Sequence, residues 1–323
     1  MTLWASCFCL QAQQQSKMDY PALLTVAADG SGDYTTINEA IQHFRAYSPI
    51  PLKLILKKGV YREKVLIPHA LCNLTIEGTN RDSTIITFDD YSGKLFSECV
   101  TSNTDQRKHT TFTSYTLAIY GNDIHLINLT IRNTAGRVGQ AVALHVEGDR
   151  ITVDQCNLLG NQDTLFTGND TSRQWYTNCY IEGTTDFIFG PATALFQDCE
   201  MRSLSNSYIT AASTPQGKFF GYVFDRCRLT AAAEVTKVYL GRPWRKYART
   251  VWIHSQMGTH IHPAGWHNWN DPQNERTAFY AEYQNNGPGA DTQSRVSWSR
   301  QLQPAEQEKY TPSEILGDWV NRN

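Results

Sequence analysis

The sequence predicts an all-β fold, a parallel β-helix closed by short helices at its ends, and three observations lead to this prediction. A strand-like motif recurs along the chain, with one position occupied by Leu129, Cys156, Cys179, Cys199 and Cys227. The intervals are 27, 23, 20 and 28 residues, and a motif that returns every 20 to 50 residues or so is typical of a solenoid. The segments between the repeats contain no long amphipathic helix, which disfavours alternating strands and helices.

The expected strands are short runs of alternating residues separated by Gly, Asn and Asp. The repeated motif accounts for those at 73–76, 128–131, 155–158, 178–181, 198–201 and 226–229. Others are expected at 141–146, 164–166, 187–189 and 194–196. Coils of a parallel β-helix stack at the strand spacing of about 4.7–4.9 Å, so equivalent residues of successive coils lie above one another.

The aligned cysteines are therefore expected to form a ladder inside the solenoid. Either they are small buried apolar residues, or stacked neighbours are close enough to form disulfides. The first candidate for a bond is Cys179 with Cys199, which have the shortest interval.

Two short helices are expected to cover the open ends of the solenoid, which would otherwise expose strand edges and apolar surface. Near the start, residues 36–39 (TINE) match a capping box, and apolar residues at 37, 40, 41 and 44 share one helical face. At the other end, Thr311 and Pro312 suit the N-cap and first position of a helix.

Composition limits the range of partners. Lys and Arg total 29 against 31 Asp and Glu, a formal charge of −2, so no overall field attracts nucleic acid or an anionic membrane. No apolar run reaches the roughly 18 residues of a membrane span. Residues 3–10 resemble the end of a secretory signal, so we expect residues 1–20 to be a signal segment or leader. Residues 21–323 show no linker-like shift in composition and are expected to form a single domain, acting as a monomer.

Two acidic residues lie in corresponding contexts one coil apart. Asp163 stands in GNQDTLF and Asp186 in TTDFIFG, 23 residues later. Stacked coils would hold the carboxylates about 5 Å apart, and since both cannot ionise easily there, one pKa is raised while the other stays low. Such a pair supplies an acid and a base or nucleophile. The alternative is that both are turn residues bonded to backbone amides, although the apolar neighbours of Asp186 argue against it.

Five further residues are candidates for a site around this pair. Arg242, within LGRPW, could make a bidentate contact that keeps Asp186 ionised. Gln140 and Gln162 offer neutral amide donors that could stabilise an oxyanion. Trp244 and Trp266 suit stacking on sugar rings, although a single arginine in a turn or a tryptophan in a core is equally ordinary.

Several other mechanisms lack their motifs. The chain has no G-x-S-x-G elbow, H-E-x-x-H zinc motif, Walker loop or dinucleotide-binding glycine motif. Its nine histidines show no ligand spacing. No metal and no cofactor are expected.

The chain resembles the pectin methylesterase (pectinesterase) family over about residues 25–320. The resemblance rests on motifs that occur in the same order, namely 140–144 (QAVAL), 160–165 (GNQDTL), 184–190 (TTDFIFG) and 240–244 (LGRPW), with further agreement at 29–34, 59–63, 263–266 and 282–285. It implies a right-handed parallel β-helix, secreted from the cell, that hydrolyses the methyl esters of galacturonate in pectin without a metal and releases methanol.

The resemblance also implies a role for each matching residue. Asp186 would be the nucleophile, and Asp163 the acid that protonates the leaving methoxide and then the base that activates water. Gln140 and Gln162 would hold the oxyanion, and Arg242 would orient Asp186 and contact the substrate. The groove would be lined by Thr111, Phe189, Trp244 and Trp266.

Two alternatives stay open, and the chain departs from plant members in places. A non-catalytic pectin-binding β-helix would keep the groove without turnover, and a lyase or hydrolase on the same scaffold would cut the polymer. Pectate lyases use a calcium site of clustered carboxylates, which the sequence does not suggest. Asn161 replaces a tyrosine of plant members, and residues 210–215 (TAASTP) also differ, so subsite preference is expected to differ.

Overall fold

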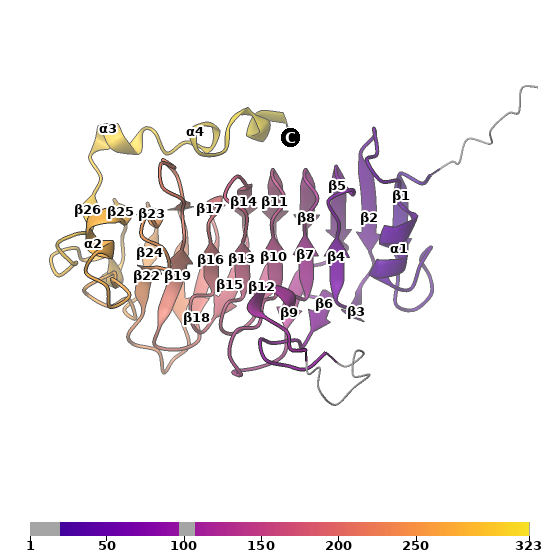
Figure 1. Ribbon diagram of the computed structural model, residues 1–323, viewed down its shortest axis with the longest axis horizontal. Coiled ribbons are helices and arrows are strands. Elements are labelled where there is room, and N and C mark those ends of the chain that lie inside the picture. Colours follow the sequence, from indigo (N-terminus) through magenta and orange to yellow (C-terminus); the bar gives the residue numbers. More distant parts are fainter. Residues whose placement is uncertain (1–19, 97–106, 323) are drawn as a thin grey trace, which may run out of the picture.

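The computed structural model describes residues 20–96 and 107–322, and these form a parallel β-helix with three sheets along its length (Figure 1). The prediction of an all-β solenoid is confirmed. The expected leader at residues 1–20 lies outside the described residues except for Tyr20.

Most coils contribute one strand to each sheet, and the coils at the ends contribute to fewer sheets. Sheet A runs in the order β1 (Leu23–Val26), β2 (Leu52–Leu56), β5 (Leu74–Gly78), β8 (Ile124–Ile127), β11 (Ile151–Asp154), β14 (Arg173–Thr177), β17 (Thr193–Gln197), β20 (Tyr222–Asp225), β23 (Arg249–Ile253), β25 (Phe279–Tyr283) and β26 (Arg300–Gln301). Sheet B contains β3 (Gly59–Arg62), β6 (Thr84–Phe88), β9 (Thr130–Asn133), β12 (Asn157–Leu159), β15 (Tyr180–Gly183), β18 (Glu200–Ser203), β21 (Arg228–Ala231) and β24 (Gln256–Met257). Sheet C contains β4 (Val65–Ile67), β7 (Leu117–Ile119), β10 (Leu144–Val146), β13 (Leu165–Thr167), β16 (Ile188–Gly190), β19 (Tyr208–Ala212) and β22 (Tyr239–Pro243).

From residue 128 onward the repeated motif marks the turn from sheet A to sheet B rather than one continuous strand, whereas its first copy, at 73–76, leads into β5 of sheet A. Its first residue adopts a left-handed conformation in every coil, with φ between 52° and 61° at Asn73, Asn128, Gln155, Asn178, Asp198 and Arg226. Asn and Asp tolerate this conformation best because their short polar side chains bond locally. From Asn128 onward, the repeat visible in the sequence is thus the corner between sheets A and B.

The cysteine ladder lies in the interior as expected, but the predicted disulfide is absent. Cys156, Cys179, Cys199 and Cys227 are buried free thiols. The Sγ of Cys179 bonds the carbonyl of Val153 at 3.3 Å instead of pairing with Cys199. These cysteines therefore act as small buried apolar residues with weak hydrogen bonds.

The two predicted end helices have different outcomes. Helix α1 (Ile37–His43) begins at the N-cap Thr36, whose side chain accepts from the N–H of Glu39, and it buries Ile37, Ala40 and Ile41 in the core as expected. Helix α4 (Pro312–Leu316) begins at Thr311 as expected, but its predicted position at the C-terminal end is wrong. It packs against β14 and β17 on the outer face of sheet A, so the chain turns back along the solenoid (Figure 1).

The returning segment has an apolar surface to cover. Leu195, Val223 and Val251 on the outer face of sheet A form a second core with Ile315 and Leu316. The remaining short helices are α2 (Asn274–Thr277), α3 (Pro304–Gln307), η1 (Thr111–Thr113), η2 (Pro288–Ala290) and η3 (Asp318–Arg322). Among the described residues, no helix has the length and apolar character to cross a bilayer.

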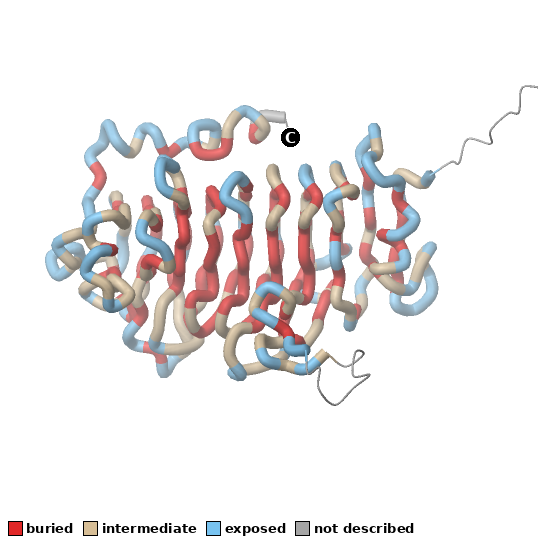
Figure 2. Tube along the Cα trace, viewed as in Figure 1, coloured by how far each residue is buried: buried red, intermediate tan, exposed pale blue. Residues whose placement is uncertain are grey.

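The interior is packed with aromatic rings stacked from coil to coil, within the band of buried strands in Figure 2. Ring centroids are 4.6 Å apart for Tyr176 and Phe196, 4.5 Å for Phe196 and Phe224, and 3.8 Å for Phe224 and Trp252. The stack packs successive coils against one another inside the solenoid.

Replacing Phe224 by alanine leaves a cavity in this stack. We expect the free energy of unfolding to fall by about 3–5 kcal/mol, measured by denaturant titration. Phe219→Ala is the control, since this side chain is 53% exposed, and it should change stability by only about 0.5 kcal/mol. Equal losses in both variants would contradict the role of the stack.

Candidate active site

The pairing of neighbouring coils places Asp163 and Asp186 one above the other. In sheet C, Leu165 pairs with Ile188 and Phe166 with Phe189. Asp163 stands two residues before the start of β13, and Asp186 stands two residues before the start of β16. Both have left-handed backbones, with φ of 65° and 48°. Each therefore stands at a corner just before a buried strand, which aspartate tolerates better than most residues. Asp186 is thus not a strand residue, although the sequence around it is apolar.

Arg242 reaches Asp186 from two coils away. It lies on β22, in line with Ala211 on β19 and Phe189 on β16. Its Nε donates to Oδ1 of Asp186 at 3.0 Å and its Nη2 to Oδ2 at 2.6 Å. In this row Ala211 stands between Arg242 and Phe189. It also lines the cavity over the two aspartates, where its small side chain leaves space. The bidentate contact expected from the sequence is present.

Burial and charge act differently on the two carboxyl groups. Asp163 is 8% exposed and Asp186 is 5% exposed. Burial, together with the neighbouring charge of Asp186, raises the pKa of Asp163 to about 8. Burial also raises the pKa of Asp186, but the hydrogen bonds and positive charge of Arg242 oppose that rise. At neutral pH the arrangement favours a protonated Asp163 beside an ionised Asp186.

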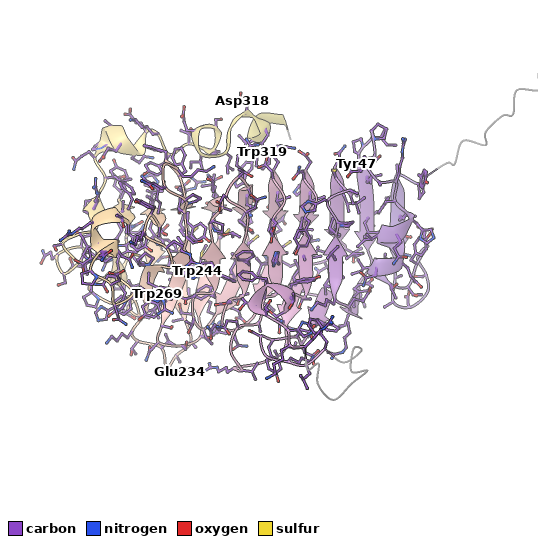
Figure 3. All side chains as sticks on the ribbon, in the orientation of Figure 1. Tyr47, Glu234, Trp244, Trp269, Asp318 and Trp319 are labelled. Carbon is purple, nitrogen blue, oxygen red and sulfur yellow. The ribbon has the colours of Figure 1, made fainter. Side chains whose placement is uncertain are left out.

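A cavity of about 260 Å³ opens over this pair. Eight of the nine residues proposed from the sequence line it, namely Thr111, Gln140, Gln162, Asp163, Asp186, Phe189, Arg242 and Trp244. Sequence reasoning missed Phe112, Ala211 and Trp269, which also line it; Trp244 and Trp269 are labelled in Figure 3. A site with two carboxyl groups, one guanidinium and two amides can carry out acid–base and nucleophilic chemistry.

The two glutamines come from neighbouring coils. Gln140 and Gln162 form a parallel backbone bridge, and the N–H of Ala141 donates to the carbonyl of Gln162 at 3.1 Å. Both therefore enter the cavity beside Asp163. Amide donors at this place suit an oxyanion without adding a titrating group.

The prediction that Trp266 lines the groove is wrong, because this side chain does not line the cavity. It is 1% exposed, stacks on Tyr280 with centroids 4.4 Å apart and donates its indole N–H to Glu282 at 3.3 Å. The groove is lined instead by Trp269, three residues later. The segment 264–269 (AGWHNW) contains both tryptophans, and sequence alone did not indicate which belonged to the core.

Aromatic rings continue from the cavity along the outer face of sheet C. Centroids are 5.0 Å apart for Phe112 and Phe166, 4.9 Å for Phe166 and Phe189, and 5.9 Å for Phe189 and Trp244. Such rings offer faces on which sugar rings can stack. Within residues 20–96 and 107–322, no group of three or more His, Cys, Asp or Glu residues is arranged to hold a metal.

Comparison with known proteins gives a consistent picture. The family model described as Pectinesterase matches residues 23–318. The chain is 35% identical to Pectinesterase 31 of Arabidopsis thaliana, covering 87% of each protein, and 36% identical to a pectinesterase of Daucus carota, covering 92% of this chain and 94% of that protein. It is 36% identical to Pectinesterase/pectinesterase inhibitor U1 of Solanum lycopersicum, but spans only 52% of that longer protein.

Solved structures agree with the fold. The pectin methylesterase from carrot superposes with a TM-score of 0.83 at 35% identity, covering 93% of this chain and 95% of the other. PemA from Erwinia chrysanthemi gives 0.78 at 30% identity, covering 93% and 98%. A pectin methylesterase in complex with a hexasaccharide gives the same values. These structures are right-handed parallel β-helices, as predicted for this chain.

The raised pKa of Asp163 makes stability depend on pH. Its folded-state pKa of about 8 lies above the ordinary value of 3.8, so the stability contribution of this carboxyl is complete below the lower value and is lost as pH rises through the upper one. We therefore expect Asp163→Asn to raise the unfolding temperature above that of the wild type by about 2–8 °C at pH 9 and to change it little at pH 4.

Calorimetry across this pH range measures the difference. Asp170→Asn, at an exposed carboxylate, is the control and should show no such trend. A stability gain equal at both pH values would mean that Asp163 is not kept protonated by its surroundings.

Proposed function

The chain belongs to the pectinesterase family, and we propose that it hydrolyses the methyl esters of galacturonate in pectin, releasing methanol and demethylated pectin. The observation that carries this proposal is the pair of stacked aspartates, one with a pKa raised to about 8 and the other held by Arg242, in a cavity of about 260 Å³. The related carrot and Erwinia structures are pectin methylesterases, which supports the same substrate for this chain.

In the first step, the ionised carboxylate of Asp186 attacks the ester carbonyl carbon. The carbonyl oxygen gains negative charge, which the amide groups of Gln140 and Gln162 stabilise by hydrogen bonds. As the intermediate collapses, the bond to the methoxy oxygen breaks, and Asp163 gives its proton to that oxygen. Methanol leaves, and the galacturonate acyl group is joined to Asp186 as an anhydride.

In the second step, Asp163 acts in the opposite direction. It is now a carboxylate and accepts a proton from a water molecule that attacks the same carbonyl carbon. The bond to Asp186 breaks, which frees the galacturonate carboxyl group and restores the ionised Asp186. Asp163 is left protonated, so the cycle needs no metal and no added cofactor.

Arg242 explains why the roles are divided in this way. Its bidentate contact favours the charged form of Asp186. No described residue makes a comparable contact to Asp163, whose pKa is raised by burial and by the charge of Asp186. Thr111, Phe189, Trp244 and Trp269 line the space around the ester, where the aromatic rings can stack on the sugar units of the chain.

Pectin is an extracellular polymer, so we also propose that the protein is secreted and that residues 21–323 form its single catalytic domain. The described strands form one continuous stack of coils, which supports the single domain.

Removing either carboxylate should abolish most turnover. We expect Asp186→Asn and Asp163→Asn each to lower kcat for methanol release from methylated pectin by about 100- to 10,000-fold. Asp170→Asn, at an exposed carboxylate outside the catalytic cavity, should keep wild-type activity. Binding of pectin by the wild type without methanol release would instead favour a non-catalytic protein, and unsaturated or reducing chain ends would indicate polymer cleavage.

The pH dependence follows from the two protonation states. The first step needs protonated Asp163, whose pKa is about 8, so kcat/KM should fall tenfold for each pH unit well above that value. It should also fall at acid pH as Asp186 becomes protonated. A methanol-release assay between pH 3 and about pH 10 measures the profile, and a flat profile would contradict these roles.

A further inference from the structure

The guanidinium of Arg242 lies between two aromatic rings. Its central carbon is 4.0 Å from the ring centroid of Tyr208 and 3.7 Å from that of Trp269. At these distances both ring faces contact the planar cation. The edge of the same guanidinium carries the two N–H groups that bond Asp186. One side chain is thus fixed by rings on its faces and by a carboxylate at its edge.

Tyr208 is itself held by a stack of rings. Tyr239 stacks on it with centroids 5.4 Å apart and an interplanar angle of 21°, and His262 stacks on Tyr239 at 4.5 Å. His267 contacts Tyr208 and Tyr239 edge-on, at 5.4 Å from each. Its Nδ1 also accepts the backbone N–H of Trp269 at 3.0 Å, which connects the two sides of the sandwich.

We propose that Tyr208 is a positioning residue for the ester hydrolysis: together with Trp269, it fixes the plane of the Arg242 guanidinium so that two N–H groups face Asp186. Tyr208 does not line the catalytic cavity, so it acts through Arg242 rather than on the substrate. This inference rests on the proposed function of Asp186 as the nucleophile.

The geometry of a bidentate contact explains why such a clamp is needed. An arginine side chain has many rotamers, and both N–H bonds form only when the guanidinium and the carboxylate lie nearly in one plane. The arginine also crosses the width of β19 to reach Asp186. Rings on both faces exclude the rotamers in which the guanidinium turns out of that plane, and so keep the nucleophile aimed.

Kinetics of Tyr208→Leu test the proposal. Misplacing a catalytic group by about 1 Å is enough to cost a large factor in rate, so we expect kcat for methanol release to fall by about 10- to 100-fold while KM changes by less than about threefold. Tyr208→Phe restores the ring face without the hydroxyl and should recover most of the lost kcat. Tyr239→Leu is the matched control, because it removes a ring from the same stack that does not contact Arg242, and its effect on kcat should be much smaller.

A double-mutant cycle separates positioning from general packing. In an Arg242→Lys background the planar group is gone, so Tyr208→Leu should lower kcat by less than about threefold there. An equal loss in both backgrounds, or a rise in KM with kcat unchanged, would overturn the proposal. Should Tyr208→Leu fail to fold, Tyr208→Met keeps more of the apolar volume and serves in the same cycle.

Failure of the proposed function gives a different result. If the wild type releases no methanol from methylated pectin, the enzyme assignment falls, while the clamp is still measured by unfolding temperature. Tyr208→Leu should then lower the unfolding temperature more in the wild-type background than in an Arg242→Met background. Equal shifts would show that the ring does not act on Arg242.

Discussion

The hydrogen-bonded register between neighbouring coils is the constraint on which the site depends. In a parallel β-helix, each residue of sheet C is locked above its counterpart in the next coil, as Leu165 is with Ile188. Two aspartates at equivalent positions therefore cannot move apart without breaking the ladder on both sides. A like-charge pair that would separate in a flexible loop is held together, and its pKa values are driven apart.

Part of this arrangement could be predicted from the sequence, because it repeats with the period of the coil. The 23-residue interval between Asp163 and Asp186 equals that between Cys156 and Cys179, so both pairs were expected to be stacked. Arg242 could also be proposed, because a buried carboxylate needs a cation and this arginine lies in a turn-like motif.

Features that depend on contacts between segments far apart in the sequence could not be predicted from the sequence. Trp266 and Trp269 are three residues apart, and only the position of Tyr280 and Glu282 decides that the first is buried. The capping chemistry of helix α4 was visible at Thr311, but its place over β14 and β17 depends on an apolar patch on the outer face of sheet A. The cysteines were correctly placed inside, whereas their bonding depends on side-chain rotamers that spacing does not determine.

In the proposed mechanism, the charges of the site also bear on the release of the product. The substrate ester is neutral, and its binding displaces water from the cavity, which disfavours ionisation of Asp163 further and keeps it an acid. Hydrolysis then creates a new carboxylate beside Asp186, so two negative groups share the one guanidinium of Arg242. Arg242 already makes both of its short contacts to Asp186, so a product carboxylate would have to share that cation with Asp186. In the proposed mechanism, the demethylated unit therefore lies beside the like charge of Asp186, which opposes its binding.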